Sequence, residues 1–439
     1  MFLSIIPENA LMITALCIFL ATYVCLLALP KYRAYIALIA ALVFVVLGIS
    51  PITGIFGQID FNVLMMIAGT MGIVALFIES KMPALLADLL LKIVPNVKWA
   101  VIVLSLFAGI VSAFVDNVAT VLMVAPVALS IAKKLKISPV PAIICIAISS
   151  NLQGAATLVG DTTSIMLGGA LDMSFIDFFV YQGKLGLFFI VEVGALVTVF
   201  ILIFLFRKES QPIKWDEKTE VKDYFPTILL LGMIVLLIIA SLLNIPSGFV
   251  KDNINGLIVM FLLVVGLVYK LVRTKDIKGL GETIKEIDLF TLLLLTGLFI
   301  VIGGLENAGV IEKIGSIISS VSGTNIFVTY TIIVWISVLF SAVVDNIPYV
   351  LTMLPVIATL GTSMGIEGVP YVLYFGLIIG ATLGGNITPI GASANIAGLG
   401  ILRKEGYEVP AKTFMKYSVP FTIAAVVTGY ILCWLIWGV

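Results

Sequence analysis

Histidine is absent from this chain of 439 residues, and charged residues make up only 11% of it. Without histidine the chain lacks the commonest zinc ligand and the usual proton shuttle. Soluble domains carry about a quarter charged residues, and no soluble core takes up a chain that is 61% hydrophobic. The bilayer is therefore the expected solvent. A formal net charge of zero gives no reason to expect a nucleic-acid partner.

Cysteine is also scarce, and the four cysteines show no metal-ligand spacing. All four lie in apolar runs, where cysteine usually acts as a small hydrophobic residue. The N-terminus lacks the basic start and small-residue cleavage site of a signal peptide, so the first apolar run is expected to stay as a membrane span. We expect no cofactor beyond coupling ions.

Long apolar runs account for most of the chain. They cover residues 10–29, 34–50, 60–78, 185–206, 226–243, 254–272, 288–305 and 418–437. At this length only helices satisfy the backbone in lipid, so we predict an all-α polytopic membrane protein. Four further segments contain Asp, Asn, Gly and Pro where a plain span would not, at 99–135, 139–170, 325–362 and 369–402.

Sequence blocks from the two halves resemble each other. "SAFVDNVATVLMVAPV" from Ser112 and "SAVVDNIPYVLTMLPV" from Ser341 are identical at nine of sixteen positions. An apolar run opened by Asp60 or Asp288 precedes each block, and a Gly/Thr/Asn-rich break follows it, all at an offset of about 230 residues. Three matches in order indicate an internal duplication. The predicted units are a first repeat (1–206), a linker (207–225) and a second repeat (226–439).

Basic residues predict how each repeat crosses the membrane. The central linker is rich in Lys and Arg, and Lys31 with Arg33 forms the first basic loop, so both are expected in the cytoplasm. The helix from Asp60 then starts outside and the helix from Asp288 starts inside, which makes the repeats inverted. Both termini are predicted to be extracytoplasmic, and the protein is expected in the cell (inner) membrane.

The segments 99–132 and 325–362 are predicted to be re-entrant hairpins. Lys98 precedes the first and the basic run "KKLK" follows it, so both of its ends are expected on the cytoplasmic side, whereas the second has no Lys or Arg at either end. Each half then contains five transmembrane helices plus one hairpin, ten spans in all, with broken helices at the midplane.

Acidic residues at membrane depth are functional candidates, because a bare charge in lipid is costly. Asp116 and Asp345 fall at the two hairpin tips, Asp161 in the first break, and Glu192 in the middle of span 185–206. We expect no Lys or Arg at comparable depth. Four such acids must then bind cations or hold protons, and Glu192 is a candidate proton carrier.

The two breaks, "GDTTS" at 160–164 and "TPIGASAN" at 388–395, should free carbonyls and amides that bind ions and solute. Oxygen-only sites suit hard cations such as sodium. The candidate ion ligands are Asp116, Asn117, Gly160, Asp161, Ser164, Asp345, Asn346, Gly391 and Asn395, and the candidate solute contacts are Thr157, Thr162, Thr388 and Ser393. Asp161 aligns with Ala392, so the first-half site is expected to be the stronger cation site.

The motifs "VDNVATVLMVAPV", "NLQGAATLVGDTTS" and "GGNITPIGASAN" resemble the ion transporter superfamily. The resemblance is to its branch of arsenite permeases, NhaD-type sodium/proton antiporters and the P protein, with a citrate transporter-like domain. It implies one ion site at Asp116, Asn117, Gly160 and Asp161, and another at Asp345, Asn346, Gly391 and Asn395. It also implies a homodimer in which a transport domain moves against a scaffold by an elevator motion.

These observations predict a secondary transporter that moves a small inorganic ion or solute coupled to protons or sodium. Sodium/proton antiport and arsenite efflux both fit. A sodium-coupled dicarboxylate or citrate transporter is an alternative. Related dicarboxylate transporters have Ser at the hairpin tips, however, and the Asp residues found at those positions here would repel a polyanion. An intramembrane aspartyl protease with Asp116 and Asp161 as its dyad, and a passive channel, are rivals from other classes.

Overall fold

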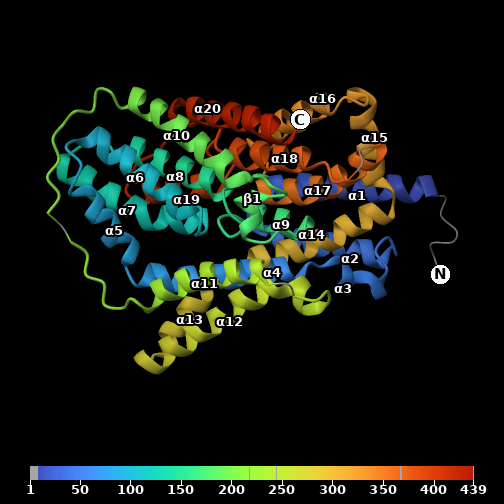
Figure 1. The fold of residues 1–439 in the computed structure, drawn as a ribbon, viewed down its shortest axis with the longest axis horizontal. Helices are drawn as coiled ribbons and strands as arrows, with labels where there is room; N and C mark the ends of the chain where they lie inside the picture. The colour runs from blue at the N-terminus through green and yellow to red at the C-terminus, as the bar shows by residue number, and fades with distance from the viewer. Residues whose placement is uncertain (1–7, 217, 244, 366–367, 439) are drawn as a thin grey trace.

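The computed structural model describes residues 8–216, 218–243, 245–365 and 368–438, and these are almost entirely helical (Figure 1). The few residues of the predicted repeats and linker outside these ranges are not described. The first half contains α1 (Glu8–Ala28), α2 (Arg33–Val46), α3 (Ile55–Gln58), α4 (Phe61–Glu79), α5 (Met82–Leu91), α6 (Val97–Ser112), α7 (Asn117–Leu135), α8 (Val140–Gly154), α9 (Thr162–Ala170) and α10 (Leu187–Leu205). The second half contains α11 (Phe225–Leu242), α12 (Phe249–Thr274), α13 (Ile277–Lys285), α14 (Leu289–Asn307), α15 (Val310–Ser322), α16 (Ile326–Ser341), α17 (Asn346–Ser363), α18 (Tyr371–Gly384), α19 (Ser393–Lys404) and α20 (Ala411–Trp437).

Short 3-10 turns at Pro30–Tyr32, Ile52–Gly54 and Ile176–Phe178 join some of the helices. A two-stranded hairpin, β1 (Val180–Tyr181) paired antiparallel with β2 (Lys184–Leu185), leads into α10. Gln182 and Gly183 make its turn, and both have positive φ, as a tight two-residue hairpin turn requires. The all-α prediction is therefore confirmed apart from this one small hairpin.

The helix order in α4–α10 recurs in α14–α20. Equivalent acids begin the first helix of each series. Asp60 accepts a hydrogen bond from the Val63 amide at 2.9 Å, and Asp288 accepts one from the Thr291 amide at 3.1 Å. Such caps satisfy amides that the first turn leaves open. Both acids therefore mark helix starts, as the sequence predicts.

Pairs of helices from opposite halves pack in the same way. In the pair α2–α14, a Cβ on Gly297 would lie 2.6 Å from the carbonyl carbon of Ala37, and in the pair α4–α12 a Cβ on Gly69 would lie 2.7 Å from the Val259 side chain. Gly69 and Gly297 hold equivalent positions in the repeated blocks, so Ala37 and Val259 are equivalent too. In each half, therefore, one helix packs against a helix of the other half through a close glycine contact.

The equivalent helices α4 and α14 run in opposite directions. Gln58, just before α4, lies against Gly303 near the end of α14, whereas Met71 and Ile78 of α4 share a cavity with Asp288 at the start of α14. The hairpin of α6 and α7 and the hairpin of α16 and α17 lie toward opposite ends of the molecule (Figure 1). An inverted repeat requires this arrangement, and the side of the membrane that each hairpin faces stays a prediction.

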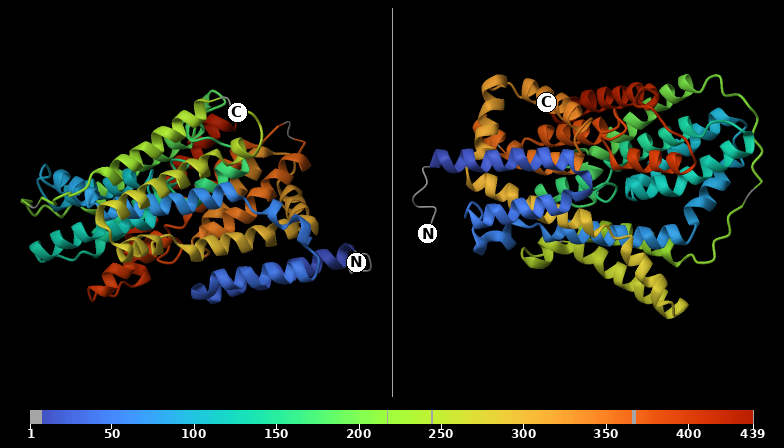
Figure 2. Two further views of the ribbon diagram at one scale, coloured as in Figure 1. Left: turned by 90° about the horizontal axis from the view of Figure 1, so that it is seen from below. Right: turned by 180° about the vertical axis from the view of Figure 1, so that it is seen from behind.

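The helices form two packing groups. One, called the frame group here, contains α1, α2, α4, α11, α12 and α14, in which α12 packs on α4 and α2 on α14. The other, called the hairpin group, contains α6–α10 and α16–α20, which pack mainly on one another. Helices α5 and α15 connect the two groups, and α1 lies at the edge of the molecule in both further views (Figure 2).

Eight helices in the described residues are long and apolar enough to cross a membrane, or nine if the bent pair α15–α16 counts as one span. These eight include α7, which belongs to a predicted hairpin, so only seven of the ten predicted spans are among them. The other three are too short, because α2, α8 and α18 contain 14, 15 and 14 residues. The predicted span 34–50 is helical only from Arg33 to Val46. The two predicted hairpins are helix–turn–helix units, formed by α6 with α7 and by α16 with α17.

The linker between the halves is docked onto the first hairpin and α5. It runs around one end of the molecule from α10 to α11 (Figure 1). The Val97 amide donates to the Gln211 carbonyl at 3.0 Å. The carboxylate of Asp88, on α5, accepts hydrogen bonds from Trp215 Nε1 at 2.9 Å and from the Thr219 amide and hydroxyl at 2.7 Å. Three donors stabilise the charged form of this buried carboxylate, so this contact is structural.

Candidate functional site

Four helices of the hairpin group begin at one central cavity. They are α7, α9, α17 and α19, and their first residues, Asn117, Thr162, Asn346 and Ser393, all line it. A helix N-terminus presents free amides and the positive end of the helix dipole. The two hairpins and the two breaks therefore bring four positive helix ends to one place, two from each half.

Acidic residues cap three of these four helix ends. Asp116 Oδ1 accepts from the Val118 and Ala119 amides at 3.0 and 3.1 Å, Asp161 from the Thr162 amide at 2.9 Å, and Asp345 from the Ile347 amide at 3.1 Å. The cap position of α19 is Ala392, which has no side chain that can accept. The α19 end is therefore free to meet a ligand, while the three others already face a carboxylate.

The central cavity has a volume of about 190 Å3, below the range of roughly 300–1,000 Å3 that drug-sized ligands occupy. Its lining comes from both halves and consists of Met71, Val74, Ala75, Ile78, Asp116, Asn117, Val118, Ala119, Leu122, Asp161, Thr162, Glu286, Asp288, Thr291, Asn346, Ile347 and Ser393. Among these described residues there are four acids and no Lys or Arg. The cavity therefore suits a cation or a small neutral solute better than a free anion.

The breaks hold the hairpin tips through matching hydrogen bonds. The hydroxyl of Thr157 in the first break donates to the Ala113 carbonyl, and the hydroxyl of Thr388 in the second donates to the Ala342 carbonyl. Ala113 and Ala342 are the turn residues that follow α6 and α16. The two threonines therefore position the hairpin tips, and neither lines the central cavity.

Glycine is needed where each break meets its hairpin tip. A Cβ on Gly160 would lie 2.5 Å from the Gly154 carbonyl oxygen, and a Cβ on Gly391 would lie 2.6 Å from the Gly385 carbonyl oxygen. Two hairpin carbonyls lie within 3 Å of each of these Cβ positions as well, those of Ser112 and Ala113 and those of Ser341 and Ala342. Both glycines allow a close backbone approach, and the structure places neither on the cavity wall.

A chain of hydrogen bonds joins Asp161 to Asn117. The Thr163 hydroxyl donates to Asp161 Oδ2 at 2.7 Å and lies 2.9 Å from the Thr382 hydroxyl. The Thr382 carbonyl accepts from Asn151 Nδ2 at 2.7 Å, and Asn151 Oδ1 accepts from Asn117 Nδ2 at 3.0 Å. All of these side chains are buried. The network therefore connects the two polar sides of the first-half site through a residue of the second half.

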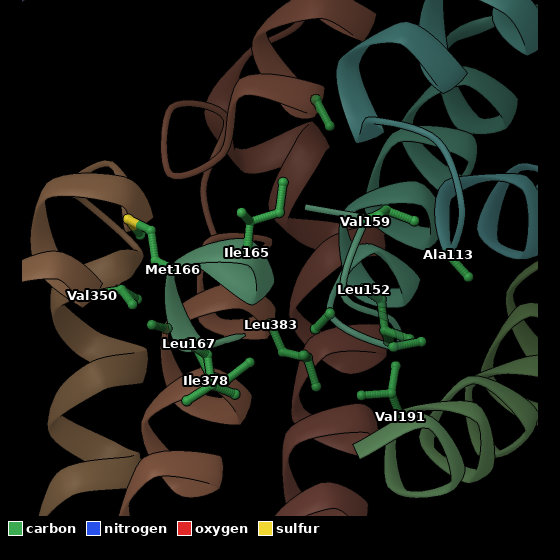
Figure 3. Close-up of a cluster of buried hydrophobic side chains, with 14 of the residues drawn as sticks. Ala113, Leu152, Val159, Ile165, Met166, Leu167, Val191, Val350, Ile378 and Leu383 are labelled. Atoms are coloured by element: carbon green, nitrogen blue, oxygen red, sulfur yellow. The ribbon is translucent and has the colours of Figure 1, made fainter. Parts of the chain in front are cut away.

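Apolar packing fixes the position of the short helix α9. Met166 and Leu167 of α9 lie on the side of Val350 of α17 and Ile378 of α18, whereas Ile165 projects the other way (Figure 3), and all of them are buried. Helix α9 packs against α17, α18 and α4. Its N-terminus at Asp161 is therefore held in the cavity by contacts with both packing groups.

The expectation that no Lys or Arg lies near the deep acids is wrong for Asp345. Arg33 at the start of α2 donates from a guanidinium nitrogen to Asp345 Oδ2 and forms an ion pair with it. Asp345 does not line the central cavity but a neighbouring one, together with Tyr23 and Arg33. The expectation failed because Arg33 was assigned to a loop at the membrane surface.

The remaining predicted site residues do not line the cavity. Asn395 Nδ2 donates to the Gly385 and Thr388 carbonyls at 3.1 Å and so holds the second break together. Asn395 Oδ1 and Ser164 Oγ are buried and have no hydrogen-bond partner among the described atoms. Glu192 is half-buried on α10, which packs on α20, and is not part of the cavity wall.

Six polar residues at or beside the cavity were not among the predicted ligands, namely Asn151, Thr163, Thr382, Glu286, Asp288 and Thr291. The first three lie in the repeated sequence blocks that contain the breaks, so their place in those blocks was an available signal. Asp288 was predicted only as a helix start. The cavity reaches the start of α14 on the side where α13 (Ile277–Lys285) lies, and the basic residues of that region predict the cytoplasmic side.

Apolar helices of spanning length, two hairpins and a polar cavity between two halves define a multi-pass membrane transporter. The chain belongs to the citrate transporter family, whose sequence model matches residues 23–376. It is 30% identical to the transporter Mb2703 of Mycobacterium bovis over 96% of this chain and 98% of that protein. It is 27% identical to the human P protein over 91% of this chain and 56% of that protein.

Two solved transporters have a similar fold. The YdaH transporter of Alcanivorax borkumensis matches with a TM-score of 0.61 at 13% identity, covering 92% of this chain and 97% of that one. MtrF of Neisseria gonorrhoeae, described as illuminating a class of antimetabolite efflux pumps, matches with a TM-score of 0.55 at 14% identity, covering 95% and 97%. The predicted resemblance to the ion transporter superfamily is confirmed, and the family is one of transporters rather than proteases.

Proposed function

We propose that this protein is a secondary active transporter that moves a small inorganic ion or solute, coupled to protons or sodium bound at Asp116 and Asp161. The observation that carries the proposal is that both acids line one cavity whose described walls contain no Lys or Arg. Two carboxylates at membrane depth without a basic partner need a cation or a proton. Ion binding would then be a condition for filling or closing the site.

The two halves of the cavity are proposed to have different roles. Asp116 and Asp161 both belong to the first half, where the coupling cation would bind. The second half offers Asn346, Ser393 and the uncapped start of α19. An uncapped helix start with a hydroxyl beside it suits an electron-rich or negatively charged group, so the solute is proposed to bind on this side.

Two substrates fit the size and charge of the cavity. Sodium itself would exchange for protons at the acids. Arsenite, which is mostly neutral As(OH)3 at pH 7, would need hydroxyl and amide contacts such as those of Thr162, Ser393 and Asn346. A volume of about 190 Å3 suits either of these small species.

A citrate-type anion is the second candidate. It is favoured by the uncapped N-terminus of α19 at the cavity, because helix starts are anion sites, and by the description of the family as citrate transporters. Such an anion would have to bind after cations or protons had neutralised Asp116 and Asp161. In sodium/proton antiport the cation is itself the transported substrate, whereas in citrate transport it must bind before the anion can bind.

The proposed transport movement is a displacement of the hairpin group against the frame group. The two groups meet mainly through α14 with α17, α4 with α9 and α4 with α7, which is a limited contact surface. The cavity lies at this boundary and reaches the predicted cytoplasmic side, so the arrangement is proposed to be the inward-facing state of an elevator. A homodimer through the frame group, in the cell membrane, completes the proposal.

Flux in proteoliposomes tests the function directly. The purified protein is reconstituted, and sodium, arsenite and citrate fluxes are compared under an imposed pH gradient and an imposed sodium gradient. The proposal expects saturable flux of at least one of them, coupled to a gradient, and loss of coupling in Asp116→Asn and Asp161→Asn. Asp252→Asn is the matched control, because Asp252 is an exposed acid in the first turn of α12.

Two results would contradict the proposal. Citrate uptake that needs no coupled cation would exclude a cation site at Asp116 and Asp161. A conductance that rises linearly with voltage and shows no counterflow would indicate a passive channel. Native mass spectrometry of the same preparation tests the homodimer.

A further inference from the structure

The ion pair between Arg33 and Asp345 joins the two packing groups. Arg33 belongs to the frame group, and its Nε also donates to the Pro30 carbonyl at 3.3 Å, which fixes the guanidinium at the start of α2. Asp345 caps α17 at the tip of the second hairpin. The Arg33 and Asp345 side chains are 22% and 15% exposed, so the pair is mostly withdrawn from solvent and is not a surface salt bridge.

The register of α2 against α14 places Arg33 beside the second turn of α14, inside the helical layer. Gly297 lies against Ala37 and Gly304 lies against Phe44, seven residues further along both helices, so the helices run parallel. Arg33 then lies level with Leu293 in the second turn of α14, about 6 Å beyond the start of that helix at 1.5 Å per residue. An arginine at this depth is costly without a partner, and Asp345 is the partner.

The other half of the protein has no such cation. The packing of Gly69 against Val259 is equivalent to that of Gly297 against Ala37, so the residue equivalent to Arg33 is Asn255, which is uncharged. Asp116, the equivalent of Asp345, lines the central cavity, whose described walls contain no Lys or Arg. A fixed positive charge is therefore present at only one of the two hairpin tips.

Uncharged contacts hold the same hairpin against α1. The Tyr23 hydroxyl lies 2.6 Å from both the Pro348 carbonyl, to which it donates, and the Thr352 hydroxyl. The cavity beside the ion pair is lined by apolar residues of α1, the α16–α17 turn and α19, and Tyr23, Arg33 and Asp345 are its titratable lining groups in the described residues. Tyr349, on α17, lies beyond it and bonds to Ser337 at 3.0 Å. The described lining therefore contains no second acid that could pair with Arg33 in place of Asp345.

These observations lead to a statement about coupling, which rests on the proposed function. When the hairpin group moves against the frame group, Asp345 leaves Arg33 and becomes a bare carboxylate in an apolar setting, which is strongly unfavourable. We infer that Arg33 is a built-in counterion of Asp345, and that a sodium ion or a proton must replace it each time the second hairpin leaves α2. The fixed arginine and the mobile cation thus compete for one carboxylate.

Replacing the arginine with a neutral residue tests the competition. In Arg33→Gln the fixed competitor is lost, so the mobile cation should bind Asp345 more tightly. The concentration of sodium that gives half-maximal thermal stabilisation of the detergent-purified protein should fall at least threefold, or the midpoint pH of stabilisation by protons should rise by at least half a unit. Arg33→Lys should restore values close to those of the original protein.

Matched variants separate this effect from a general loss of structure. Lys31→Gln removes a neighbouring exposed charge and should leave the half-maximal sodium concentration and the midpoint pH unchanged. Tyr23→Phe loosens the same hairpin without changing charge and should shift these two values much less than Arg33→Gln does. If Arg33→Gln does not fold, the double variant Arg33→Gln with Asp345→Asn contains no unpaired charge. It should bind fewer coupling ions, seen as a lower Hill coefficient in sodium- or proton-dependent flux.

Three outcomes would overturn the inference in distinguishable ways. If Arg33→Gln folds and keeps the half-maximal sodium concentration and the midpoint pH of the original protein, Arg33 does not compete with a cation. If the double variant keeps the ion dependence of the original protein, Asp345 is not a cation site. If the original protein has no sodium or proton dependence, the proposed coupling fails first and this inference fails with it.

Discussion

Asn151 of α8 donates its amide to the backbone carbonyl of Thr382 of α18 at 2.7 Å, and these two residues hold equivalent positions in the two repeated blocks. Equivalent residues touch only near an axis that relates the halves. This contact lies between the first-half acid Asp161 and the first hairpin, so the acidic site is built around the centre of the molecule.

Asp161→Asn is expected to weaken or abolish the sodium or pH dependence of transport. The carboxylate accepts hydrogen bonds from the Thr162 amide and the Thr163 hydroxyl, and an amide oxygen keeps those acceptor contacts while losing the charge. The half-saturating sodium concentration should rise about tenfold or the pH profile should become flat, as measured by flux in proteoliposomes. An unchanged profile, in a variant folded as well as Asp252→Asn, would remove Asp161 from the ion site.

Asn346→Ala is expected to weaken solute binding rather than ion coupling. Asn346 is the first residue of α17 and lines the second-half side of the cavity. Losing one amide contact should raise KM about fivefold to tenfold, or about 1 kcal/mol, with the sodium and pH dependence retained. Concentration series of the transported solute measure this, and Thr362→Ala, at an exposed position of the same helix, serves as the control. An effect confined to ion dependence would contradict the assignment.

Thr382→Val should disturb the first-half site from the second half. The substitution keeps the shape of the side chain and removes the hydroxyl that bonds to Thr163 at 2.9 Å. We expect a loss of stability of about 1 kcal/mol, and a shift of ion dependence in the direction of Asp161→Asn but smaller. Thr382→Ser should restore both. Thr428→Val, whose hydroxyl bonds only within its own helix to Ala424, should shift neither, as checked by thermal unfolding and flux.

Gly160→Ala and Gly391→Ala should both reduce the amount of folded protein. Each new Cβ would lie within about 2.7 Å of backbone carbonyl oxygens that cannot move aside easily, and such overpacking costs about 1–3 kcal/mol. Gly232→Ala, where a Cβ meets nothing within 4 Å, should be neutral. Size-exclusion profiles and thermal unfolding compare the three. Normal folding of Gly160→Ala would mean that the break and the hairpin tip separate readily.

Asp88→Asn should loosen the central linker. The carboxylate holds Trp215 and the Thr219 amide and hydroxyl, and an amide group can accept fewer of these three donors. Limited proteolysis within residues 207–224 should become at least several-fold faster, whereas Asp216→Asn, at an exposed position of the linker, should cleave at the original rate. Equal cleavage rates in the two variants would show that the linker stays docked without Asp88.

The repeated blocks made much of the fold predictable from sequence. The Asp-Asn pairs at 116–117 and 345–346 were expected at hairpin tips, and both lie at the turns between paired helices. Breaks were expected at 160–164 and 388–395 from their Gly, Thr and Asn content, and the structure interrupts the helices a few residues earlier, at 155–161 and 385–392. Repetition is informative because a pattern that recurs in order is unlikely to arise by chance, and because both copies must solve the same packing problem.

Contacts between distant segments were not predictable in the same way. The sequence placed Arg33 in a surface loop because a basic residue between two apolar runs usually marks one. Only the packing of the short α2 along α14 brings it to the depth of Asp345. The bond from Asn151 to Thr382 likewise depends on how α8 and α18 cross, which the order of residues along the chain does not determine.

The docked linker also limits how far the molecule can move. Thr219 is held by Asp88 of α5, and the Lys222 carbonyl accepts from Arg273 of α12 at 3.2 Å. Only two residues separate these anchors, and three fully extended peptide units reach about 10–11 Å. The linker therefore limits how far α5 and α12 can separate. While both anchors hold, α5 can turn about its tethered point, but a longer excursion from α12 would first have to release one of them.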